Sequence, residues 1–184
     1  VPDLPGLRAF EVRRANVTDV AAAYRALGRR TPPRLADHRG IAAFSYAAGP
    51  AVLAALEPGL RERVGFVVAV GGYYDLEAVI TFLTTGAYRT NGGWRHAEPH
   101  PYAKWAFVLS NAELVPDARD RRFLERLARE KLHRPGVDVS ALAANLGEGG
   151  RAVYRLVTNT DRERVPRLLA DLPAPIRREL AALD

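Results

Sequence analysis

The chain contains no cysteine. This absence excludes disulfide bonds, thiolate metal ligands and a cysteine nucleophile. Long apolar runs are also lacking: the stretch around Phe66–Val70 is far shorter than the roughly 20 residues that a membrane-spanning helix needs. The first residues show no charged and apolar pattern of a secretory signal. We therefore expect a cytoplasmic protein with no membrane partner.

Methionine is absent as well, even at position 1. Because an open reading frame begins with methionine, we expect a processed or partial chain. The opening residues, Val1-Pro2-Asp3-Leu4-Pro5-Gly6, read like the middle of a domain.

What is present is ordinary for a globular protein: 48% hydrophobic and 26% charged residues over 184 positions. The net charge of +6 comes mostly from arginines spread along the chain. Such an excess is compatible with an acidic partner such as nucleic acid, or with a solvated arginine-rich surface. Because no aromatic-basic motif accompanies the charge, we favour the surface and expect no nucleic-acid partner.

Two apolar runs predict strands, at residues 40–44 and 64–70. Between them, Gly49-Pro50 opens a predicted helix that extends to Leu56. Neither run alternates with polar residues, which is typical of parallel strands buried on both faces. The order strand, helix, strand predicts a βαβ unit and hence an α/β fold. A helix from Thr18-Asp19 to Gly28 precedes the unit, and another covers 76–84.

The character of the sequence changes near residue 87. Residues 87–100, AYRTNGGWRHAEPH, predict a polar and aromatic loop. Apolar periodicity then predicts helices with no further strand, at 102–113, 117–132, 138–146, 148–158, 161–171 and 174–183. We therefore predict an α/β part over residues 1–86 and an all-helical part over residues 87–184.

The stretch IAAFSYAAG places Ser45 between the first strand and the helix that follows. A serine on a sharp strand-to-helix turn, with small residues two positions away on either side, is the nucleophile-elbow pattern. The flanking positions hold Ala43 and Ala47, where the usual motif has glycines. Small side chains are needed there because the backbone approaches closely on both sides of the turn.

Three segments together resemble the α/β-hydrolase family, and more narrowly bacterial members with a helical insertion: VPDLPG at 1–6, FSYAAGP at 44–50 and VGGYYDL at 70–76. The resemblance implies that residues 1–86 are part of a hydrolase parallel sheet and that 87–184 form a helical cap over a pocket. It implies Ser45 as the nucleophile and the backbone N–H of Tyr46 as an oxyanion donor. It also implies hydrolysis of a small-molecule ester or related acyl substrate through an acyl-enzyme, without a cofactor. In this family an acid and a histidine follow on later loops, which we expect to lie outside this chain.

Asp75 has two interpretations, because some members of the fold carry the triad acid after this strand. It is either that acid or the N-cap of the helix that begins at Leu76, and its position favours the cap. Four aromatic residues are candidates for lining a substrate pocket, although each could equally belong to the core: Tyr73, Tyr74, Trp94 and Trp105.

None of the four histidines completes the triad from sequence alone: His38, His96, His100 and His133. His96 and His100 lie in the predicted loop of residues 87–100, which would be the hinge to the cap, and they are the candidates for the catalytic base. With Glu98 they also offer three metal ligands, but proline and the loop context give no helical face, so we expect no metal site. Gly71-Gly72 lacks the third spaced glycine of a dinucleotide fingerprint, so we expect no cofactor.

A competing hypothesis is a non-catalytic or truncated relative that binds a small apolar ligand or a protein partner through the cap. Fold resemblance by itself does not establish chemistry. The sequence gives no indication of the oligomeric state.

Overall fold

The structure is a computed structural model that describes residues 2–73 and 75–184, with the side chains of residues 36 and 37 left aside. It divides the chain into two compact units. The first comprises Val1–Tyr74 and Leu180–Asp184, and the second comprises Asp75–Glu179. The boundary predicted from the sequence lies between residues 86 and 87, after the helix of residues 76–85, whereas the two units divide before this helix.

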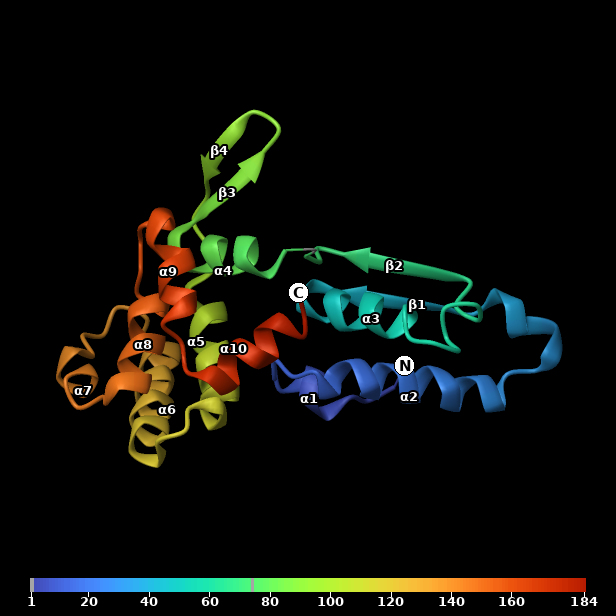
Figure 1. Cartoon of the computed structure of the whole chain (residues 1–184), viewed down its shortest axis with the longest axis horizontal. Helices are drawn as coiled ribbons and strands as arrows, with labels where there is room; N and C mark the ends of the chain where they lie inside the picture. The colour runs from blue at the N-terminus through green and yellow to red at the C-terminus, as the bar shows by residue number, and fades with distance from the viewer. Residues whose placement is uncertain (1, 74) are drawn as a thin grey trace. The chain divides into compact units, whose positions relative to one another are not determined.

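The first unit contains three α-helices and one small sheet among its described residues (Figure 1). Its elements are, in order, α1 (Pro5–Arg8), α2 (Ala15–Arg30), η1 (Pro33–His38), β1 (Gly40–Phe44), η2 (Ser45–Ala47), α3 (Ala48–Ala55) and β2 (Phe66–Val70). A short helix begins at Pro5, within the opening segment. The helix predicted from Thr18-Asp19 to Gly28 begins earlier, at Ala15, and continues two residues past Gly28.

Strands β1 and β2 pair in parallel, as a βαβ unit requires. Gly40 lies opposite Phe66 and Phe44 lies opposite Val70. A side chain at position 40 would collide with the Phe66 ring, so this register depends on glycine there. The α/β class predicted from the sequence is confirmed at this level; the sheet of the described residues has only these two strands.

Helix α3 packs on α2 and on both strands, and it forms the middle of the first unit (Figure 1). Its sequence, AGPAVLAA, presents small side chains that allow close approach of the neighbouring elements. Ala51 and Ala54 are buried, together with Ala21 and Tyr24 of α2 and with Leu60 after α3. Burial of this apolar area is the main stabilising term of the unit.

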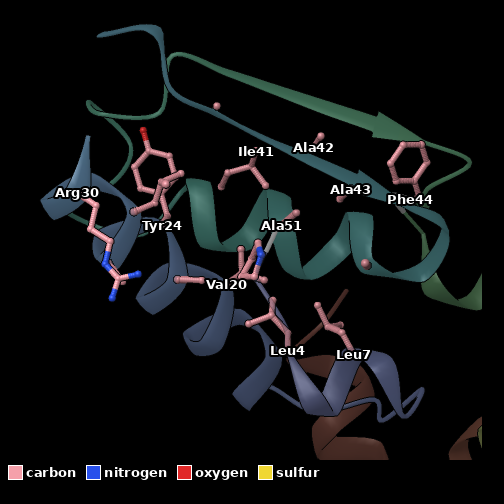
Figure 2. Close-up of a pocket in the computed structure, with 16 residues that line it drawn as sticks. Leu4, Leu7, Val20, Tyr24, Arg30, Ile41, Ala42, Ala43, Phe44 and Ala51 are labelled. Atoms are coloured by element: carbon pink, nitrogen blue, oxygen red, sulfur yellow. The ribbon is translucent and has the colours of Figure 1, made fainter. Parts of the chain in front are cut away.

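The prediction that both strands are buried on two faces is wrong for this sheet. In β1 only Ala43 is buried, and Phe44 is 67% exposed; in β2 all five residues are exposed, with Val68 at 47%. In the described part of the chain no third strand joins this sheet, so each strand has an unpaired edge. An apolar groove of about 700 Å³ follows β1 on the side of α2, and Leu4, Leu7, Val20 and Ile41 contribute to its walls (Figure 2).

The second unit is mostly helical, but it also contains an antiparallel hairpin (Figure 1). Its elements are α4 (Leu76–Thr85), β3 (Ala87–Thr90), β4 (Gly93–His96), α5 (Pro101–Asn111), η3 (Ala112–Leu114), α6 (Ala118–His133), α7 (Ser140–Ala143), α8 (Glu148–Val157), η4 (Arg162–Arg164), α9 (Val165–Ala170) and the start of α10 (Ala174–Ala181). The hairpin corrects the prediction of a loop at 87–100 and of an all-helical region from residue 87.

Helices α5, α6 and α8 enclose the core of the second unit. Helix α6 supplies its apolar stripe with Leu124, Leu127 and Ala128 fully buried. Asp117 caps this helix, because its carboxylate accepts hydrogen bonds from the backbone N–H groups of Arg119 and Asp120, both at 2.8 Å.

A membrane-spanning segment requires a helix that is both long and apolar. None of the helices in the described part of the chain meets both requirements.

Candidate functional site around Ser45

Ser45 occupies the turn between β1 and the helical segment that continues into α3. Its φ of 54° lies in the left-handed region, where a residue with a Cβ costs about 1–2 kcal/mol. Phe44 before it is extended, and Ala48 after the turn is already helical. The serine is exposed, while Ala43 and Ala48 on either side of it are buried. The chain therefore turns sharply at Ser45 and leaves this residue accessible.

Tyr46 anchors the turn to the N-terminal segment. Its hydroxyl donates a hydrogen bond to the carbonyl oxygen of Leu7, and its ring stacks on the Phe10 ring with centroids 5.8 Å apart. Burial raises the pKa of the Tyr46 hydroxyl to about 12, and the nearby negative charge of Glu11 contributes in the same direction. The phenol is therefore a protonated hydrogen-bond donor throughout the physiological pH range.

The chain after β2 passes closely over the beginning of α3. A Cβ at Gly72 would collide with the Cβ of Ala48 and would lie 3.8 Å from the carbonyl oxygen of Ser45. The Tyr73 ring lies against Gly49, where any side chain would overlap it. Burial raises the pKa of Tyr73, and the nearby Asp184 carboxylate raises it further. Tyr73 is thus close to the turn, and its placement beside the α3 N-terminus comes from the absence of side chains at positions 49 and 72.

Asp75 is the N-cap of α4, and its Oδ1 accepts a 2.8 Å hydrogen bond from the backbone N–H of Ala78. This is the structural role that the sequence favoured. A left-handed Gly86, with φ of 75°, closes the same helix. The residues at its two ends, Asp75 and Gly86, therefore determine where α4 begins and ends.

The tryptophans occupy different environments in the second unit. Trp105 is only 5% exposed on α5 and belongs to the core. Trp94 is 46% exposed on β4, and the Arg162 guanidinium lies 4.8 Å from its ring centroid. Tyr74 lies outside the described residues. The structure thus gives Trp105 a packing role and leaves Trp94 exposed beside Arg162.

His38 is the histidine of the first unit. It precedes the N-terminal end of β1, whereas Ser45 follows the C-terminal end. A five-residue strand is about 16 Å long, which separates His38 from Ser45 by far more than a hydrogen bond. His100 caps α5, where its Nδ1 accepts a 3.3 Å hydrogen bond from the backbone N–H of Tyr102. His96 packs against Gly86, and His133 ends α6 on the surface.

Metal ligands do not gather at any point of the described chain. Over residues 2–73 and 75–184, no three or more His, Asp or Glu side chains are grouped in a way that could hold a metal ion.

Sequence reasoning did not find the contacts of Leu7 and Phe10 with the Ser45 turn. No local motif predicts these contacts, because Leu7 and Phe10 lie 39 and 36 residues before Tyr46 in the sequence. The one available signal is the aromatic residue directly after the serine: Tyr46 requires a partner for its hydroxyl when it is partly buried.

Comparison with known proteins gave no match: no protein-family profile, curated protein or solved structure is significantly similar to this chain.

Proposed function

We propose that the protein is a serine hydrolase of the α/β-hydrolase type that cleaves an ester or related acyl bond through an acyl-enzyme on Ser45. The observation that carries the proposal is the left-handed φ of 54° at an exposed serine between a strand and a helix. Strain of this kind in a residue with a Cβ persists only where surrounding structure holds it, and it concentrates at functional sites.

The neighbouring backbone supports the same chemistry. The N–H of Tyr46, directly after the nucleophile, is the proposed oxyanion donor. The segment Ser45–Ala47 runs into α3, so the positive end of the helix dipole is on the side of the turn. Both features favour negative charge developing on a carbonyl oxygen held at Ser45.

Hydrolysis also requires a general base and an acid that orients it. We place neither among the elements packed around Ser45: His38 lies at the other end of β1, and Asp75 serves as a helix cap. The proposed cap is the region from residue 87, with the hairpin and helices of the second unit, and Tyr73 is the aromatic residue proposed to meet the substrate.

The test is covalent labelling of the protein, expressed from its complete reading frame, with a fluorophosphonate probe. We expect labelling of the parent protein and none of Ser45→Ala. The chain offers matched controls, because its other two serines are Ser110 and Ser140. Ser110→Ala and Ser140→Ala are expected to label as the parent does. Equal labelling of Ser45→Ala and the parent would disprove the nucleophile and favour the non-catalytic binding protein.

A further inference from the structure

The described chain has two residues other than glycine with positive φ, and they belong to segments in direct contact. These are Phe10, with φ of 60°, and Ser45, with φ of 54°. The Phe10 ring stacks on the ring of Tyr46, the residue after Ser45, with an interplanar angle of 29°. Because the left-handed conformation is unfavourable for a residue with a Cβ, contacts of the fold must hold both conformations.

The carbonyl oxygen of Leu7 joins the two segments. It accepts a 3.1 Å hydrogen bond from the backbone N–H of Phe10 and a second hydrogen bond from the Tyr46 hydroxyl. The first bond closes the turn that gives Phe10 its left-handed conformation. The second ties this turn to the residue that follows Ser45. Ring stacking and hydroxyl bonding therefore act on the same side chain.

The N-terminal segment is itself anchored to α2. Asn16 is buried on α2, and its Nδ2 donates a 2.5 Å hydrogen bond to the carbonyl oxygen of Glu11. The backbone N–H of Glu11 in turn donates to the carbonyl oxygen of Gly6 at 2.9 Å. These hydrogen bonds hold the segment of residues 6–11 against α2.

We infer that Tyr46 is a positioning residue: through its hydroxyl and ring, the segment of residues 6–11 holds the Ser45 turn in its left-handed conformation and orients the Tyr46 N–H. This inference rests on the proposed function of Ser45. Loss of the phenol would let the turn relax toward ordinary φ values, which moves both the serine hydroxyl and the oxyanion donor. A displacement of about 1 Å at such a site costs up to roughly a hundredfold in rate.

The test measures how fast the fluorophosphonate probe labels the protein expressed from its complete reading frame. Rates over a range of probe concentrations separate reversible binding of the probe (Ki) from the covalent step (kinact). Tyr46→Phe keeps the ring and removes the hydroxyl. We expect kinact to fall roughly tenfold to a hundredfold, with Ki changed less than about twofold.

Tyr24→Phe is the matched control. The Tyr24 hydroxyl is also buried in the first unit and donates to two backbone carbonyls, those of Arg63 and Arg39, but it is not bonded to the segment of residues 6–11. Its removal is expected to lower the melting temperature by an amount similar to Tyr46→Phe and to leave kinact unchanged. Equal kinact for the parent, Tyr46→Phe and Tyr24→Phe would overturn the inference. If Tyr46→Phe does not fold, Phe10→Leu removes only the stacking, and a kinact equal to that of the parent would overturn it likewise.

These results separate the inference from the function on which it rests. Labelling that persists in Ser45→Ala means the nucleophile itself is wrong. Labelling that is lost in Ser45→Ala but is unaffected by Tyr46→Phe means only that the positioning role is wrong.

Discussion

The Asp120 carboxylate accepts a 2.7 Å hydrogen bond from the backbone N–H of Gly150, thirty residues further along the chain. Its other oxygen accepts a 2.5 Å hydrogen bond from the N–H of Gly147. Asp120 is only 2% exposed, so a helix-borne carboxylate of α6 caps the N-terminus of α8 inside the second unit. Glycine is required at 150, because a Cβ there would lie 2.8 Å from the carboxyl carbon.

Asp120→Ala is therefore expected to destabilise the second unit by about 2–4 kcal/mol, because two N–H groups lose their acceptor in a buried site. Urea unfolding followed by circular dichroism measures the change. Asp117→Ala removes an exposed cap of the same helix, whose N–H groups water can then solvate, and is expected to cost clearly less. An equal cost for the two variants would contradict the buried role of Asp120.

Ser45→Gly is expected to be more stable than Ser45→Ala by about 1 kcal/mol. Glycine adopts a positive φ without the Cβ penalty, whereas alanine retains it. The free energies of unfolding of the two variants in urea test this difference. At Ser110, inside α5, the order should reverse, because glycine weakens a helix relative to alanine. A Ser45→Ala variant as stable as Ser45→Gly would mean that the turn is not strained.

Stability is expected to fall as pH rises from about 10 to about 12. The folded Tyr46 keeps its proton up to a pKa of about 12, whereas the unfolded tyrosine loses it near its ordinary value of 10. Over this window the unfolded state binds fewer protons, so alkalinity favours unfolding. Tyr73, whose pKa is also raised, contributes with the same sign.

Unfolding free energies measured across this window should decline less steeply for Tyr46→Phe than for the parent. The double variant Tyr46→Phe, Tyr73→Phe should decline least. Identical slopes in all three proteins would contradict the assignment of the alkaline loss to these phenols.

Residues 1–184 expressed alone are expected to self-associate. The described sheet exposes Phe44, Phe66 and Val68 together with the groove along β1, and unpaired apolar strands are templates for intermolecular pairing. Val68→Lys places a charge on the exposed strand and should raise the monomer fraction in analytical ultracentrifugation. A parent chain that is already monomeric and melts cooperatively would contradict this expectation.

Local signals accounted for much of the fold. Gly40–Phe44 forms a strand because it is a short apolar run, and Asp75, Asp117 and Gly86 mark helix ends because their own chemistry satisfies terminal backbone groups. The hairpin was missed although Asn91-Gly92, between β3 and β4, is a two-residue turn signal. Its strands have four residues each and are largely exposed, so they lack the apolar alternation on which strand prediction relies.

Burial of the strands could not be predicted from β1 and β2 alone, because it depends on how many neighbours a sheet has. The contacts that support the Ser45 turn could not be predicted for a similar reason, because Leu7 and Phe10 reach Tyr46 only in the folded chain. Asp120 left a usable signal, since it lies four and seven residues before Leu124 and Leu127 on the buried stripe of α6. A charged residue in such a stripe requires buried partners.

Mapping the site of covalent attachment tests whether Ser45 is the nucleophile. The protein from the complete reading frame is treated with a fluorophosphonate, digested and analysed by mass spectrometry. We expect one phosphonylated peptide, which contains Ser45, and no adduct at Ser110 or Ser140. An adduct on another residue, with the Ser45 peptide unmodified, would show that Ser45 is not the nucleophile.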